Sequence, residues 1–400
     1  MFGFFGKPSK KEFANLVLAQ IKATGGKDGW VFMEDAFEIR RGTNRGFLGN
    51  TYAAYCQAKG EMRAKILSNY VSAMAADLDS EISLDDARPN LVTVVRERVL
   101  FAFTSLLWQL EDSEKHPTQQ TETISAWFTK ALVIDAPGHM QLVNEEHLQG
   151  WHITSDEAFA MGLERLRDCT VSKFSEENGV YRGTWNDDYD SSRILLPRLF
   201  DDLPLKGCPV ITIPNRLTLL VAGSDDPEAI RRMLVKAEEI VRTIARPHNP
   251  APLVIRNGKI EDFTVEPSSP IFHDVQKAVR MAPLIYYQEQ KTSLEKLYEK
   301  NGKDLFVASY TLTQKDGAYG SVAVWTKGVP TLLPVADEIV FVDSALPKGS
   351  NAVAVAKWDD VVACVGDLLL DTKMFPARYY VSKFPTEEQL RLMASKSAGR

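Results

Sequence analysis

The sequence predicts an α+β protein in which helix-plus-hairpin units form antiparallel sheet covered by helices. Stretches with the 3.6-residue apolar repeat of a helix alternate with short apolar runs, near residues 10–41, 155–185, 190–222 and 227–265. Asn-Gly pairs, a strong signal for a tight hairpin turn, join two pairs of these runs. Hairpins build antiparallel sheet, and the helices between them then pack on one face of it.

The first hundred residues are predicted to be rich in helix. Residues 10–23 place their apolar side chains on one helical face, and a hairpin follows about Glu34-Asp35. Helical patterns continue over residues 47–56 and 62–74. Pro89 suits a first helical turn, so we expect a long helix from there to about Leu110.

Strands and one capped helix are predicted next. Residues 128–135 and 140–143 have strand character and are joined by a short turn. Thr154 or Ser155 can cap a helix over residues 157–167. A strand at 171–174 is then expected to pair with one at 180–185 across the Asn-Gly turn.

The clearest folded unit of the sequence spans residues 180–245. A strand leads into an acidic turn, a short apolar helix begins near Ser191, and a hairpin follows over residues 209–222. The last helix has a complete start signal, since Asp226 can cap it and Pro227 fits its first position. Its apolar residues fall on one face, so this helix is expected to cover a sheet.

A linker is predicted at Pro267, Ser268, Ser269 and Pro270. It divides the chain into an α+β domain at 1–266 and a second, smaller α+β domain at 273–400. The elements expected in the second domain are a helix at 273–301, strands at 305–313, 320–326, 338–342 and 378–381, and helices at 357–365 and 385–394.

Composition and charge argue against some classes of function. The net charge of −6 argues against a nucleic-acid binder, which normally has a basic surplus. No window approaches the length of a membrane-spanning helix, and the basic residues follow the apolar start instead of preceding it, unlike a secretory signal. The single, widely spaced cysteines fit reduced thiols in the cytoplasm. Integral membrane association and nucleic-acid binding are therefore not expected.

Several phrases of the sequence resemble the DUF1444 (YtpQ-like) family of bacterial proteins. They are LGNTYAAY (48–55), ARPNLVTVVRERV (87–99), DAPGHMQLV (135–143), EAFAMGLERL (157–166), NDDYDSSRIL (186–195) and PVITIPNRLTLLVAGSDD (209–226). The resemblance covers about residues 1–265 and implies a bacterial protein. Because the family has no established activity, it implies no catalytic residue here. The part after about residue 270 has no such resemblance.

Asp187, Asp188 and Asp190 form the only dense acidic cluster of the 180–245 unit. Closely spaced carboxylates suit magnesium or calcium, but the ladder of a calcium loop is missing. We favour the interpretation that they cap the following helix and complement its dipole. No cofactor is expected, since neither a dinucleotide nor a P-loop fingerprint occurs.

The start of the short helix is the candidate ligand site. Tyr189 and Arg193 lie one helical turn apart, beside Ser191, so Arg193 can clamp a carboxylate or phosphate there. The alternative, which we favour, is that Arg193 pairs with Asp190 or Asp187 and fixes the turn. Catalytic residues are not identifiable from the sequence.

The sequence thus predicts a non-catalytic module that binds a protein or small-molecule partner. The alternative is a metal-dependent hydrolase that uses the Asp187/Asp188/Asp190 cluster. Whether the protein is an enzyme stays open at this point.

Overall fold

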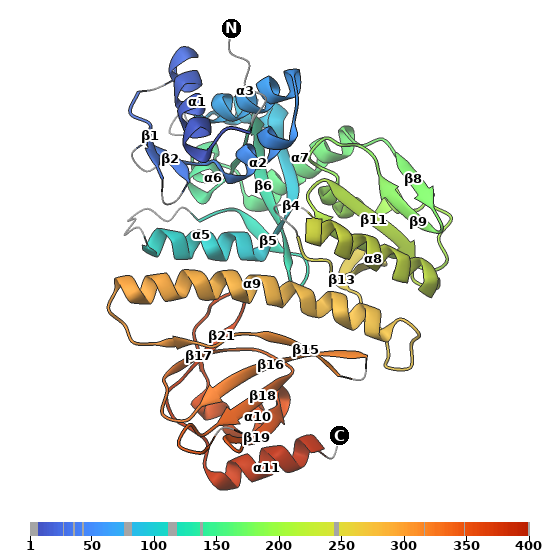
Figure 1. Ribbon diagram of the computed structural model, residues 1–400. Coiled ribbons are helices and arrows are strands. Elements are labelled where there is room, and N and C mark those ends of the chain that lie inside the picture. The colour runs from blue at the N-terminus through green and yellow to red at the C-terminus, as the bar shows by residue number, and fades with distance from the viewer. Residues whose placement is uncertain are drawn as a thin grey trace. The chain divides into compact units, whose positions relative to one another are not determined.

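The computed structural model describes residues 7–26, 28–34, 37–41, 44–75, 82–110, 118–136, 139–243, 248–315, 317–347 and 349–398 (Figure 1). Contacts divide the chain into two compact units, Met1–Thr93 with Ala131–Cys169, and Val94–Lys130 with Thr170–Arg400. The predicted boundary at 267–270 lies inside the second unit, and the independence of the two predicted domains stays a prediction. Among the helices of the described ranges, none contains an apolar stretch of the length that a bilayer span requires.

The first unit combines helices with short strands, as the sequence predicts for this section. Ser9 caps the first helix, because its Oγ accepts a bond from the backbone N–H of Glu12 at 3.2 Å and the Glu12 carboxylate accepts from Ser9 N–H at 2.7 Å. The predicted hairpin is present, although Asp35 of its turn lies outside the described residues. The elements are α1 (Lys10–Ala23), β1 (Val31–Met33), β2 (Glu38–Arg41), β3 (Asn44–Phe47), α2 (Gly49–Gln57), α3 (Glu61–Ala75), α4 (Leu84–Ala87), η1 (Arg88–Asn90), β7 (His139–Leu142), α6 (Glu145–Trp151) and α7 (Ser155–Asp168).

The long helix predicted from Pro89 to Leu110 is wrong over its first half. Strand β4 (Leu91–Glu97) occupies that part, and only α5 (Arg98–Leu110) is helical. Residues 92–95 are all β-branched, and the strand is buried on both faces up to Val95, so its apolar residues run without alternation. A Cβ on Gly162 of α7 would meet the Thr93 backbone nitrogen at 2.7 Å, so this glycine lets α7 lie directly against the strand.

Strand β4 pairs with β6 (Phe128–Ala136), which also pairs with β5 (Thr121–Thr123) and β7. The strands predicted at 128–135 and 140–143 are confirmed, and so is the Thr154 cap of α7. Helix α6, which lies between β7 and α7 in the sequence, is not predicted. Strands β4 and β6 each contribute residues to both units.

The second unit contains a six-stranded antiparallel sheet, in the order β13-β12-β10-β11-β9-β8. The Asn-Gly turns are as predicted, since Asn178 and Gly179 have φ of 52° and 80°, and Asn257 and Gly258 have 50° and 75°. The first hairpin pairs Glu177 with Val180, so its leading strand starts at Phe174, where the sequence predicted it to end. The strands are β8 (Phe174–Glu177), β9 (Val180–Gly183), β10 (Pro209–Asn215), β11 (Thr218–Gly223), β12 (Leu253–Arg256) and β13 (Lys259–Asp262).

Helix α8 (Pro227–Thr243) lies against one face of this sheet, as predicted (Figure 1). Asp226 caps it by accepting the Ala229 N–H at 3.0 Å. Its buried face consists of Ala229, Ile230, Met233, Leu234, Ala237 and Val241. The opposite face of the sheet packs against two short 3₁₀ helices, η2 (Ser191–Leu195) and η3 (Pro197–Phe200).

The rest of the second unit begins with the long helix α9 (Phe272–Lys300), which contacts both α5 and α8. The strands predicted at 320–326, 338–342 and 378–381 and the terminal helices are present, but the single strand predicted at 305–313 is two short strands of different sheets. Strands β17 and β19 are not predicted, and two strand pairs of this part are parallel. The elements are β14 (Phe306–Val307), β15 (Thr311–Lys315), β16 (Ala318–Thr326), β17 (Thr331–Pro334), β18 (Glu338–Val342), β19 (Ala352–Lys357), α10 (Trp358–Val365), η4 (Gly366–Leu368), β20 (Leu370–Asp371), β21 (Arg378–Val381) and α11 (Glu387–Ala398).

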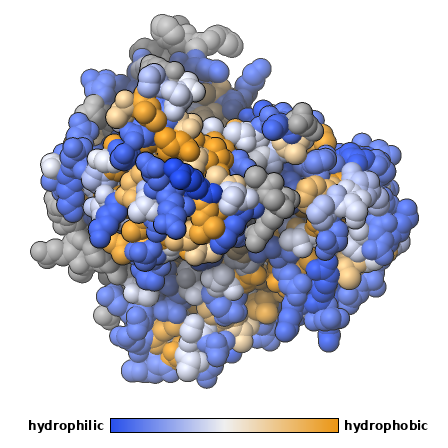
Figure 2. Space-filling model, turned by 90° about the horizontal axis from the view of Figure 1, so that it is seen from below, coloured by the Kyte–Doolittle hydropathy of each residue, from blue (hydrophilic) through white to orange (hydrophobic). Residues whose placement is uncertain are grey.

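One face of the β15-β16-β18-β19 sheet carries a row of valines. Val324, Val340 and Val355 lie side by side in register, and Val324 and Val355 are 39% and 43% exposed. Figure 2 shows hydrophobic side chains among hydrophilic ones on the surface seen from below. Exposed valines in a row are unusual for a sheet that has solvent on that side.

Candidate functional site

Arg193 is fixed by the acidic turn, as the favoured interpretation of the sequence holds, and its partner is Asp187. The Arg193 side chain is wholly buried, and its two terminal nitrogens donate to the two oxygens of Asp187 at 2.7 and 2.6 Å. Its Nε donates to Thr170 Oγ1 at 3.0 Å, and its guanidinium lies 4.4 Å from the ring centre of Trp185. The nitrogens of this guanidinium group therefore form hydrogen bonds within the protein, in the two-pronged geometry that a ligand carboxylate would otherwise use.

The three aspartates of the turn face different partners. The Asp190 carboxylate accepts the N–H groups of Asn186 and Asp187 at 3.3 and 3.4 Å, so it holds the turn closed. The expected capping of the following helix is wrong for Asp190, because its carboxylate bonds to the residues before η2 and not to the N–H groups of the helix. Asp188, at a φ of 69°, forms an ion pair with Arg216 at 3.3 Å. Burial acts to raise the pKa of Asp187, but the hydrogen bonds and charge of Arg193 outweigh it and hold this pKa below its ordinary value.

This arrangement leads to a prediction about divalent ions. In the described part of the chain, no group of three His, Cys, Asp or Glu side chains is placed to hold a metal ion. Adding magnesium or calcium should therefore leave the melting temperature unchanged, because an ion that does not bind the folded state selectively cannot stabilise it. A rise of several degrees that Asp188→Asn abolishes would contradict this and favour the metal-dependent alternative.

Tyr189 and Ser191 belong to the same turn and the start of η2. Both are buried, and the backbone N–H of Ser191 donates to the Arg216 carbonyl at 3.1 Å. The Ser191 Oγ is buried and has no hydrogen-bond partner among the described residues. A buried hydroxyl without a partner is uncommon in folded proteins.

Two basic side chains and a histidine that the sequence did not single out lie beside this turn. Burial and the charge of Arg216 lower the pKa of Arg96, while Asp188 and Tyr189 act to raise it, and the result is about 10. Burial and both arginines lower the pKa of His248 to about 3, so its ring is neutral at pH 7. Its Nδ1 is buried and has no partner within the described residues.

Glu97, which follows Arg96 in the sequence, accepts two hydrogen bonds of its own. Its Oε1 accepts the Asn249 N–H at 2.8 Å and also the hydroxyl of Tyr286 on α9. Burial raises the pKa of Glu97 to about 8, against the opposing effect of the Asn249 bond. This carboxyl group is therefore mostly protonated at pH 7.

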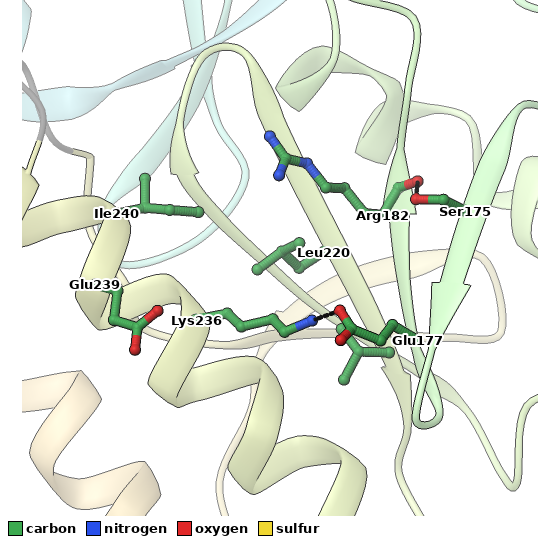
Figure 3. Close-up of a pocket in the computed structure, with 8 residues that line it drawn as sticks. Ser175, Glu177, Arg182, Leu220, Lys236, Glu239 and Ile240 are labelled. Carbon is green, nitrogen blue, oxygen red and sulfur yellow. Dashed lines mark hydrogen bonds and ion pairs between the residues drawn. The ribbon is translucent and has the colours of Figure 1, made fainter.

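A groove of about 340 Å³ lies between α8 and strands β8, β9 and β11 (Figure 3). Leu220, Val180 and Ile240 give it an apolar surface, and Lys236 reaches across from α8 to form an ion pair with Glu177. Figure 3 shows the Arg182 side chain extending from β9 above Leu220.

Arg182 differs from the other cations around this helix. Within the described ranges, no residue forms an ion pair or hydrogen bond with its guanidinium, and the residue is exposed. A second hollow of about 270 Å³ is lined by Lys206 and Arg232, but Lys206 pairs with Asp226 and Arg232 donates to the Asn178 carbonyl. Of these two hollows in the described part of the chain, the groove is the one with an unpaired arginine at its rim, and the Glu239 carboxylate lines the same groove.

Of the predicted site residues, Tyr189 and Ser191 share a buried polar cluster, whereas Arg193 and Asp187 bind each other. Arg96, Arg182 and His248 carried no sequence signal, since none of them belongs to a motif with a recognisable spacing. No family model, no curated protein and no solved structure was found to match this chain.

Proposed function

We propose that this chain is a non-catalytic binding protein that holds a small carboxylate with an apolar body in the groove beside α8. The observation that carries the proposal is the unpaired Arg182 guanidinium above the apolar surface of Leu220. A guanidinium and a carboxylate form charge-assisted, two-pronged hydrogen bonds.

Three of the residues that line the groove are apolar, Val180, Leu220 and Ile240, and the other five are polar or charged. Sites for small molecules are usually concave and begin at about 300 Å³, and this groove is more polar than most of them. The groove volume of about 340 Å³ suits a small ligand. Lys236 pairs with Glu177, and the Glu239 carboxylate also lines the groove, so the four lining charges sum to zero. An anion would therefore be held by direct contact with the Arg182 guanidinium and not by a net positive charge of the groove.

The alternative of a metal-dependent hydrolase has weaker support, because both Asp187 oxygens bind Arg193. The DUF1444 resemblance stays a prediction and assigns no residue a role. We also propose a cytoplasmic location, which the four unpaired cysteines fit.

Hexanoate and its neutral amide test the proposal on the full chain. With eight non-hydrogen atoms, hexanoate is expected to bind with a Kd of about 1 mM, and hexanamide about tenfold more weakly. Chemical shift changes of the β9 and α8 amide groups would report the binding. Arg182→Gln should weaken hexanoate binding about tenfold and leave hexanamide unaffected, because it removes only the charged contact.

Arg256→Gln is the matched control. Arg256 is an exposed arginine on β12 of the same sheet, and it pairs with Glu261 at 3.3 Å. This variant should bind both probes like the wild type. Equal binding of hexanoate by Arg182→Gln and wild type, or no hexanoate binding at all, would refute the groove as the site.

A further inference from the structure

We propose that the ligand of the groove beside α8 carries an ammonium group at the far end of its apolar body, so that it binds as a zwitterion between Arg182 and Glu239. This inference rests on the proposed function, because it takes the carboxylate contact of Arg182 as given and names the other end of the ligand. A ligand without the ammonium group would use only one of these two charged side chains, which both line the groove.

The strands place Arg182 beside an apolar side chain on the floor of the groove. Arg182 of β9 is opposite Leu220 of β11 and Ser175 of β8, so the three side chains form one row across the face of the sheet that α8 covers. Val180 and Glu177 form the next row, about 7 Å away along the strands. These five residues make up the sheet side of the groove.

Helix α8 supplies the opposite wall. Lys236, Glu239 and Ile240 are three and four positions apart, so they share one side of the helix, and all three line the groove. The Lys236 ammonium group is bound by the Glu177 carboxylate. Glu239 and Ile240 lie one helical turn beyond this ion pair, and they remain available to a ligand.

Arg182 and Glu239 are the two charges of the groove that have no partner. Both residues are exposed, and within the residues that the structure describes neither forms an ion pair, with the other or with a third group. Figure 3 shows the side chains of Leu220 and Ile240 between the guanidinium and the carboxylate. An acid and a base at the two ends of an apolar surface match a ligand with a carboxylate, an apolar chain and an ammonium group in that order.

The charge balance of the groove favours a zwitterion over a simple anion. Lys236 and Glu177 neutralise each other, and the two ends of a zwitterion would neutralise Arg182 and Glu239. An anion bound to Arg182 would instead add a second negative charge to a groove that already contains the Glu239 carboxylate, and like charges in one site reduce affinity.

Three six-carbon probes test the inference on the full chain: hexanoate, 6-aminohexanoate and 2-aminohexanoate. Each is titrated at pH 7, and chemical shift changes of the β9 and α8 amide groups give its Kd. 6-Aminohexanoate should bind about threefold more tightly than hexanoate, because an exposed ion pair adds a modest free energy. 2-Aminohexanoate has the same atoms and charges, but its ammonium group is next to the carboxylate and distant from Glu239. It should bind no more tightly than hexanoate.

Glu239→Gln is the decisive variant. Because Glu239 is exposed and unpaired in the described ranges, its replacement should leave the fold intact and should not weaken hexanoate binding. It should remove the preference for 6-aminohexanoate over hexanoate. Glu299→Gln is the matched control, since Glu299 is an exposed glutamate near the end of α9 and does not line the groove. This variant loses the same charge and should keep the preference.

The inference and the proposed function can fail separately. A wild type without the preference, a preference that 2-aminohexanoate shares, or one that persists in Glu239→Gln would overturn the zwitterion. Hexanoate binding that depends on Arg182 would, in each of these cases, still support the carboxylate site. If none of the three probes binds, both the zwitterion and the groove are refuted.

Discussion

Replacement of Arg193 by alanine is expected to lower the free energy of unfolding by about 2–4 kcal/mol. The substitution removes a wholly buried side chain, its paired bonds to Asp187, its bond to Thr170 and its contact with the Trp185 ring. The lower part of the range reflects solvent screening, because the Asp187 side chain is 37% exposed and regains water.

Urea denaturation of Arg193→Ala, Asp187→Ala and the double variant measures the effect. The double variant should lose less than the sum of the single losses, because both single changes break the same pair. Arg216→Ala is the matched control, since its ion pair with Asp188 is half-exposed and should contribute less than about 1 kcal/mol.

An Arg193→Ala protein as stable as the wild type would contradict this structural role. A side chain kept for a ligand contributes nothing to the empty protein, so that result would restore Arg193 as a ligand clamp. Of the two carboxylates that the sequence offers as partners, Asp187 accepts both terminal nitrogens of the Arg193 guanidinium.

Elements whose signals are local could be predicted from the sequence. The turn at Asn257-Gly258 needs two residues that tolerate positive φ, and only its own two residues determine that. Helix α8 has its cap, its first-turn proline and its apolar face within residues 226–243. Such signals do not depend on the remainder of the fold.

The prediction of a helix over residues 89–110 is wrong in its first half because the signal there is not local. An apolar run that is buried on both faces has no period, so residues 91–95 fit a central strand and a buried helix equally well. Partner strand β6 decides between them, and it starts more than thirty residues later. Strand β17, which pairs in parallel with β14 and antiparallel with β21, is determined by tertiary contacts in the same way.

The residues of the candidate sites also differ in how far apart in the sequence their partners lie. Arg193 and Asp187 are six residues apart, so their pairing could be anticipated. Glu97 meets Asn249 and Tyr286 over separations of 152 and 189 residues, and His248 meets Arg96 in a similar way. No sequence pattern connects such residues before the strands that carry them are assembled.

Glu97 should make the protein less stable as the pH rises from about 4.5 to 8. Its pKa is raised by burial from 4.5 to about 8, so between these values the unfolded chain has lost the proton that the folded protein keeps. Stability from this group is fully present below pH 4.5 and is lost as the pH rises through the folded pKa, at about 1.4 kcal/mol per pH unit. His248 acts in the opposite direction, because its pKa is lowered from 6.5 to about 3: its contribution to stability is present above pH 6.5 and is lost as the pH falls, and its window overlaps that of Glu97 between pH 4.5 and 6.5.

Glu97→Gln isolates this effect. Glutamine keeps an oxygen that can accept the Asn249 N–H and the Tyr286 hydroxyl, but it has no proton to lose. The free energy of unfolding of the variant minus that of the wild type should therefore increase from pH 5 to pH 9, by on the order of 4 kcal/mol. All other titrating groups cancel in this difference, to the extent that the substitution leaves their surroundings intact.

Glu289→Gln provides the comparison. Glu289 is exposed and acts on Glu97 only through its charge, so its replacement should reduce the pH dependence slightly without removing it. Denaturant titrations at each pH measure all three proteins. A difference between Glu97→Gln and wild type that is constant from pH 5 to 9 would mean that Glu97 ionises at its ordinary pKa. The buried contact with Asn249 and Tyr286 would then hold a carboxylate and not a carboxylic acid.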